Sequence, residues 1–318
     1  MADPRLYQIG VLSGLLVYGM GWLDFEITVP RAALLLLTVL ATQALGDRLD
    51  GPRPANWKSA LISGLSLCLL LRTNRPGLAV LGAVLAIAGK FLFRIRRKHL
   101  FNPTNGAIVA LLLLTDQVWV SPGQWGSVAF FGFLMACLGG LVVNRASRSD
   151  VTYAFIACYC ALVFGRSLYL GEPIAIPLHR LQSGALLLFT FFMISDPKTT
   201  PDSRAGRLLF AALVAFSAWY VQFRLFRTNG LLWSLAAWSM AVPLIDRLLP
   251  GDRYTWTTEP LSKQTAVRTV PSTGGARERL WGCPPPPVVA TAGDQLRRGL
   301  AVARKVLQAR AAEGPTTS

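Results

Sequence analysis

The chain has 318 residues, of which 53% are hydrophobic and only 15% are charged. A soluble domain is about a quarter charged and a disordered chain has low hydrophobicity, so this composition excludes both classes. The net charge of +16 could indicate nucleic-acid binding, but the low charge content argues against it. We therefore expect an all-α, polytopic membrane protein that contacts a lipid bilayer and no nucleic acid, in which cations fix the orientation.

About ten apolar segments recur between residues 6 and 249. Several are shorter than the roughly 20 residues that a straight transmembrane helix needs, and short spans can be half-helices around an internal site. We therefore predict a ten-span membrane domain over residues 1–249. The predicted spans are Leu6–Leu23, Val29–Leu45, Trp57–Leu71, Gly77–Phe93, Asn105–Val120, Gln124–Val143, Val151–Leu170, Leu181–Ile194, Leu208–Val221 and Leu231–Leu249.

The distribution of cations predicts the orientation. With ten spans, fourteen Lys and Arg residues fall on the side of the termini, without counting Arg247 and the tail, against seven on the opposite side. Because cytoplasmic loops carry an excess of Lys and Arg, we expect both termini in the cytoplasm and the chain in a bacterial plasma (inner) membrane. The five cysteines form no CxxC pair and only two histidines are present, so neither a disulfide framework nor a metal site is predicted.

An internal repeat is indicated by two similar segments. Leu100-Phe101-Asn102-Pro103-Thr104-Asn105-Gly106 joins the fourth and fifth spans, and Leu225-Phe226-Arg227-Thr228-Asn229-Gly230 joins the ninth and tenth. Five spans per half is an odd number, so the halves, about 1–121 and 122–249, would be inverted across the membrane. Inverted repeats commonly hold a site near the midplane, built at broken helices.

The first candidate site segment is Lys98–Gly106. Pro103 disfavours helical geometry at Asn102, and Asn105 or Thr104 can cap the following helix, whose free N–H groups suit a phosphate or a polar ring edge. A well-capped loop without a ligand remains the alternative. The neighbouring cations Arg94, Arg96, Arg97 and Lys98 indicate either a phosphate site or, more simply, membrane topology.

The second candidate segment is Asp196-Pro197-Lys198-Thr199-Thr200-Pro201. Its two prolines stop the helix and leave two hydroxyls, Thr199 and Thr200, in an extended turn. Asp196 ends an apolar span, where a carboxylate is costly unless it is paired or hydrated, and Arg204 or Lys198 would be its partner. A functional and a structural role are equally open for this segment.

Other polar residues lie in or near the predicted spans. They are functional candidates by default, but most are close enough to a span end to reach water. Lys90 is the most interior cation among them. The set comprises Gln43, Lys90, Asp116, Asn144, His179, Gln182, Gln222, Arg224 and Asp246.

The tail, 250–318, has the composition of a mostly disordered cytoplasmic segment. Within it, apolar residues at helical spacing alternate with cations, which predicts an amphipathic helix at 293–312. Such a helix would lie on an anionic membrane surface, or would be a solvated, half-formed helix without a role.

Three segments together resemble a known family. The Phe-Asn-Pro core of Lys98–Gly106, the stretch Leu186–Pro201 and Val242-Pro243-Leu244-Ile245-Asp246 fall in the order of the NqrB/RnfD family, the membrane subunit of sodium-pumping NADH:quinone reductases and of Rnf electron-transport complexes. The resemblance implies ten spans in two inverted halves, flavin binding, electron transfer to other subunits or to a flavoprotein or iron–sulfur partner, and coupling to cation translocation.

The resemblance also bears on the cofactor. Usual family members carry a Ser-Gly-Ala-Thr motif whose Thr is esterified to FMN, whereas here Ser183-Gly184-Ala185 is followed by Leu186. The chain is therefore similar to a short subfamily that lacks this motif, and we expect a non-covalent flavin, riboflavin or FMN, rather than covalent FMN. The residues expected to line its site are Asn102, Pro103, Thr104, Asn105, Asp196, Thr199 and Thr200.

The leading expectation is a membrane subunit of a flavin-dependent electron-transport system. Since GxSxG, HExxH and Walker A motifs are absent from the sequence, the chain is expected to be a non-catalytic subunit rather than a hydrolase or kinase. A transporter or channel of the same inverted-repeat architecture, without redox activity, is the alternative. A scaffold without a site of its own is the third possibility.

Overall fold

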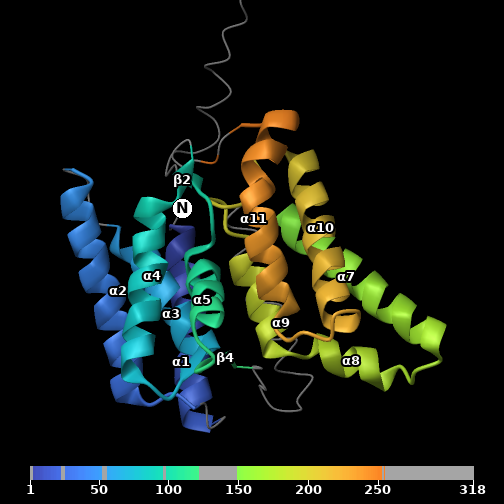
Figure 1. Cartoon of the computed structure of the whole chain (residues 1–318), viewed down its shortest axis with the longest axis horizontal. Helices are drawn as coiled ribbons and strands as arrows, with labels where there is room; N and C mark the ends of the chain where they lie inside the picture. The colour runs from blue at the N-terminus through green and yellow to red at the C-terminus, as the bar shows by residue number, and fades with distance from the viewer. Residues whose placement is uncertain are drawn as a thin grey trace, which may run out of the picture. The chain divides into compact units, whose positions relative to one another are not determined.

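The computed structural model describes residues 3–22, 26–51, 56–95, 98–121, 149–252 and 254, and these are mostly helical (Figure 1). Four of the described helices, α2, α7, α10 and α11, are long and apolar enough to cross a membrane. The α-helices are α1 Pro4–Trp22, α2 Val29–Leu49, α3 Trp57–Leu70, α4 Pro76–Leu92, α5 Pro103–Leu114, α7 Ser149–Leu170, α8 Ala175–Leu181, α9 Gly184–Leu188, α10 Arg204–Phe223 and α11 Gly230–Leu248.

Local sequence explains where several helices begin. Pro76 and Pro103 each occupy a first-turn position, where the missing N–H costs nothing. Asn102 caps α5, because its side-chain oxygen accepts from the backbone N–H of Asn105 at 3.2 Å. The expected cap was Asn105 or Thr104, so this detail of the sequence analysis was wrong: Asn102 has the extended backbone that a cap needs.

Two short antiparallel strand pairs interrupt the helices. β1 Leu71–Thr73 pairs with β4 Val118–Val120, and β2 Arg94–Ile95 pairs with β3 Lys98–His99. The predicted span Asn105–Val120 is therefore not one helix, because α5 ends at Leu114. The polar run 115–117 stops the helix, and the residues after it, including two β-branched valines, pair with β1 instead.

The predicted span Leu181–Ile194 also differs in the structure. Leu181 closes α8, and the next helix begins only at Gly184 and widens into the π-helical turn η1, Phe189–Met193. This unit is about ten residues long, too short to cross a bilayer as a straight helix. The predicted span over 124–143 and the predicted tail helix at 293–312 lie outside the described residues.

The helices pack in two groups that meet at α5 and α11 (Figure 1). In the first group α2 packs on α3 and α4, α1 packs on α3, and α4 packs on α5. In the second, α10 packs between α7 and α11. Asp150 contacts Arg207 at one end of α7 and α10, and Arg166 contacts Phe223 at the other, so these two helices run parallel. The meeting of α5 and α11 positions the polar residues described next.

Candidate functional site

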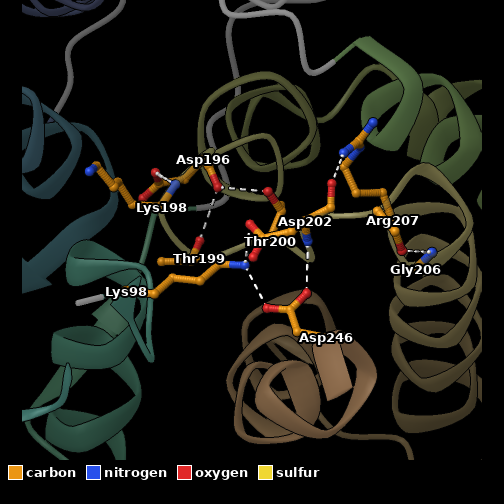
Figure 2. Close-up of polar contacts among 10 residues, drawn as sticks. Lys98, Asp196, Lys198, Thr199, Thr200, Asp202, Gly206, Arg207 and Asp246 are labelled. Carbon is orange, nitrogen blue, oxygen red and sulfur yellow. Dashed lines mark hydrogen bonds and ion pairs between the residues drawn. The ribbon is translucent and has the colours of Figure 1, made fainter. Parts of the chain in front are cut away.

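An ion-pair network joins the two helix groups at the loop before α5. Lys98 Nζ lies 2.8 Å from Asp246 Oδ2 on α11 and 3.0 Å from Asp202 Oδ1, just before α10 (Figure 2). The other oxygen of Asp246 accepts the backbone N–H of Asp202 at 2.7 Å. The three side chains are only 12–15% exposed. Because Lys98 lies between two mostly buried carboxylates, removing one partner of this network should cost more than removing one partner of a surface salt bridge.

Asn102 connects this loop to the turn at Asp196. Its Nδ2 donates to Asp196 Oδ2 and to the carbonyl of Met193, both at 3.4 Å. Asp196 Oδ1 accepts the backbone N–H of Lys198 at 2.9 Å, which tightens the turn. The sequence analysis expected these two segments at one site, and the structure brings Asn102 and Asp196 together there.

The hydroxyls of Thr199 and Thr200 form hydrogen bonds within their own turn. They donate to the backbone carbonyl of Asp196 at 3.3 and 3.1 Å, and both residues are buried (Figure 2). A threonine hydroxyl has one proton to donate, so these two can offer a ligand only acceptor lone pairs. They therefore stabilise the turn that carries Asp196.

Asn105 points away from that turn and into the contact between α5 and α11. It is fully buried, and with its amide oriented to satisfy both groups, Nδ2 donates to the Leu232 carbonyl at 3.3 Å while Oδ1 accepts from Ala236 N at 3.2 Å. Thr104 on the same helix turn donates to the Ser63 carbonyl of α3 at 3.3 Å. Asn105 thus holds α5 against α11, and Thr104 holds it against α3.

Two cavities adjoin this polar centre. The smaller, of about 90 Å³, is lined by four of the predicted site residues, Asn102, Pro103, Thr104 and Asp196, together with hydroxyls such as Ser63. Its volume is that of about three water molecules and is below the roughly 300–1,000 Å³ of ligand pockets. In its present form this cavity can hold water or a small ion, but it cannot hold a flavin ring.

The larger cavity, of about 720 Å³, has Lys98 in its wall. Its walls combine charged and apolar side chains from the loop before α5 and from the end of α11. The lining residues are Ile95, Lys98, His99, Leu100, Asp202, Val242, Pro243, Leu244, Asp246, Arg247, Pro250 and Gly251. This volume is in the range of cofactor sites.

His99 lines both cavities. Burial, reinforced by the positive charges of Lys90, Arg94 and Lys198, lowers the pKa of His99 to about 4. The ring is therefore neutral at pH 7. Its Nδ1 lies 3.1 Å from the Lys90 carbonyl, so Nδ1 carries the proton and Nε2 is left as an acceptor.

Sequence reasoning missed the most strongly paired residues of the centre. Lys98 was considered within the candidate segment Lys98–Gly106 and as part of a basic cluster. Asp246 was considered as a polar residue near a span end and as part of the family resemblance. Neither was predicted to form an ion pair, and Asp202 was not considered at all. Pro201 before Asp202 and the apolar run before Asp246 could have marked both as carboxylates at helix ends. Among the described residues, no group of three or more His, Cys, Asp or Glu side chains is placed to hold a metal ion.

Comparison with known proteins gives a partial match. Residues 112–254 match the model of the NQR2, RnfD, RnfE family. Two relatives are each a subunit of an ion-translocating oxidoreductase complex: the chain is 30% identical over 125 residues to the one from Erwinia tasmaniensis and 29% identical over 125 residues to the one from Escherichia coli (strain K12). Each alignment covers 39% of this chain and 34% of the relative, so the match spans about a third of these curated relatives.

The expected resemblance is therefore confirmed over residues 112–254. This stretch contains the turn at Asp196 together with Asp202 and Asp246. The loop with Lys98 and Asn102 precedes it. With the four long apolar helices, the match identifies a helical, multi-pass membrane protein.

Proposed function

We propose that this chain, which matches the NQR2, RnfD, RnfE family over residues 112–254, is a membrane subunit of an electron-transport complex. The observation that carries the proposal is the polar centre around Lys98, because two of its three members, Asp202 and Asp246, come from the matching stretch and frame a cavity of cofactor size. The partners would be the other subunits of the complex, among them a flavoprotein or iron–sulfur protein. Cation translocation would be a property of the whole complex.

The same proposal includes ten spans in two inverted halves. Its support is that α5 and α11 pack with opposite direction: Lys98, before α5, contacts Asp246 near the end of α11. The two similar motifs, 100–106 and 225–230, each lead into the first turn of one of these two helices. They differ locally, since Asn102 caps its helix with extended backbone whereas Asn229 is left-handed with φ 60°.

We propose that a non-covalent flavin, riboflavin or FMN, occupies the larger cavity rather than the smaller one. A flavin ring has an apolar dimethyl edge and a hydrogen-bonding edge, and the cavity offers Leu244 and Val242 for the first and Lys98 and His99 for the second. Bound flavin would supply one- and two-electron transfer. Asn102 and Asp196 would then act indirectly. They would fix the position of the loop that carries Lys98 and His99.

Purification of the full chain in mild detergent with riboflavin or FMN tests this assignment. Leu244→Trp should fill the larger cavity and reduce flavin retention at least about tenfold, because the ring loses its space. Met240→Trp is the matched control, since Met240 is exposed one turn earlier on α11 and does not line the cavity. Equal retention by wild type and Leu244→Trp would contradict the assignment.

A transporter or channel function is the second candidate. The observation that favours it is the smaller cavity, which is hydroxyl-rich and lined by Ser59, Ser63 and Ser66 of α3, groups suited to water or a small ion. Ion flux into liposomes that contain the purified chain alone, without electron donor or acceptor, would support this function. Flux that appears only with the redox partners would support the electron-transport function.

For orientation, we propose an inner-membrane location with both termini in the cytoplasm. The polar centre would lie toward the cytoplasm. The cations near it, such as Lys58, Lys98 and Lys198, belong to the side of the membrane that carries more Lys and Arg residues. Reporter fusions at residue 252 and in the turn at 225–229 test this arrangement. We expect cytoplasmic reporter activity from the first and periplasmic activity from the second.

A further inference from the structure

At the end of the bundle remote from Lys98, two arginines lie over one phenylalanine ring. The guanidinium carbon of Arg166 on α7 is 4.6 Å from the centre of the Phe223 ring, and that of Arg180 on α8 is 4.7 Å from it. Each contact is a cation–π interaction. Because both distances are measured to the same ring, the two guanidiniums cannot be farther apart than the sum of these distances.

The charge of this cluster is only partly balanced. Arg166 Nη1 pairs with Glu172 Oε1 at 2.8 Å, and Ser167 donates to the other oxygen of Glu172 at 3.1 Å. Within the described part of the chain, no carboxylate lies at ion-pair distance from the exposed Arg180, although the negative charge of Glu172 is close enough to act on it. Arg224, next to Phe223, is also exposed and adds a further positive charge. The cluster therefore has a net positive charge that can attract an anion.

The neighbouring surface is apolar. Leu168 and Tyr169, at the end of α7, are 75% and 89% exposed, and Phe226, just after α10, is 84% exposed. The helices α7 and α10 are both long and apolar enough to cross a membrane, and their ends meet here. Exposed aromatic side chains beside arginines at the ends of transmembrane helices are typical of the membrane–water interface.

We propose that Arg180, which stacks on the Phe223 ring, binds the phosphate headgroup of an anionic phospholipid. The acyl chains of this lipid lie against Leu168 and Tyr169. Phe223 holds the guanidinium at a fixed place, which reduces the entropy lost when the phosphate binds. The apolar residues favour a lipid over a free anion, because only a lipid covers them. This site is independent of the polar centre at Lys98.

Native mass spectrometry of the full chain, released from detergent micelles supplied with phosphatidylglycerol or phosphatidylcholine, tests the proposal. Wild type should retain phosphatidylglycerol in preference to phosphatidylcholine. Arg180→Gln should lower the retained phosphatidylglycerol roughly fivefold to tenfold, since a charge-assisted hydrogen bond to phosphate is lost. Arg204→Gln, an exposed arginine at the opposite end of α10, is the matched control and should retain as much as wild type.

Two results would overturn the proposal. One is equal retention of phosphatidylglycerol by wild type and Arg180→Gln. The other is displacement of the lipid by glycerol 1-phosphate at equal concentration, because the acyl chains would then contribute nothing and the site would be one for a free phosphate. Retention by the purified chain alone, without displacement, supports the lipid assignment over an acidic partner protein.

Discussion

Lys98 and Asp246 are 148 residues apart in the sequence, and the Nζ of the first lies 2.8 Å from the Oδ2 of the second. This ion pair ties the loop before α5 to the end of α11. The second carboxylate at Lys98, that of Asp202, brings in the loop before α10. One side chain thus holds three segments that the sequence keeps far apart.

We predict that Lys98→Met lowers the free energy of unfolding by about 2–4 kcal/mol, because two mostly buried carboxylates are left without their cation. Thermal or denaturant unfolding of the full chain in detergent measures this. Adding Asp246→Asn to Lys98→Met should recover part of the loss, since one unpaired charge is removed.

Lys58→Met is the matched control for this prediction. Lys58 pairs with Asp3 at 2.9 Å, but the lysine side chain is 27% exposed against 13% for Lys98. We expect a loss of about 1 kcal/mol or less. A larger loss for Lys58→Met than for Lys98→Met would refute the structural role of the three-residue network.

Asn102→Ala should reduce the free energy of unfolding by about 1 kcal/mol or somewhat more. The substitution removes the cap of α5 and the donor to Asp196. Asn102→Ser keeps a capping oxygen and should lose less. Similar stability for the Ala and Ser variants would mean that the cap does not limit the stability of α5.

Stability should fall as the pH drops from about 6.5 toward 4. The pKa of His99 is lowered from 6.5 to about 4 in the folded protein, so the unfolded chain binds a proton in this window that the folded chain does not. The loss reaches about 3 kcal/mol at and below pH 4. Unfolding curves at several pH values measure it.

His99→Gln is the comparison for the pH experiment. Glutamine does not titrate, so the variant should show a flatter dependence of the unfolding free energy between pH 6.5 and 4. If wild type and variant have the same slope in this window, His99 is not the group responsible.

Asn105→Ala should destabilise the protein by about 1–3 kcal/mol, because the substitution leaves a cavity and removes the two contacts of Asn105 with the α11 backbone. Flavin retention should change much less than in Leu244→Trp, since Asn105 does not line either cavity. A loss of flavin without a loss of stability would instead place Asn105 at the cofactor.

The sequence predicted what depends on local chemistry. Hydrophobic runs located most of the helices, Pro103 predicted the non-helical backbone at Asn102, and the two candidate segments supplied Asn102 and Asp196, which do meet. These predictions succeeded because burial and proline geometry act within a few residues.

Contacts over long sequence distances were beyond the reach of the same reasoning. The pairing of β1 with β4 depends on two chain segments that no local pattern relates. The direction of Asn105 toward α11 depends on which face of α5 the second helix group covers. Whether Lys98 pairs with Asp202 and Asp246 depends on the same packing, so the sequence could not predict this ion-pair network.

The absorption spectrum of the purified full chain tests the central claim most directly. After riboflavin or FMN is supplied and excess is removed by dialysis, we predict that the protein has a flavin spectrum. When acid precipitates the protein, this spectrum should move to the supernatant, because attachment is non-covalent. Addition of a reduced flavoprotein or iron–sulfur partner of the complex should reduce the bound flavin, oxidise the partner and bleach the flavin spectrum. A colourless protein after loading with either flavin would contradict the account.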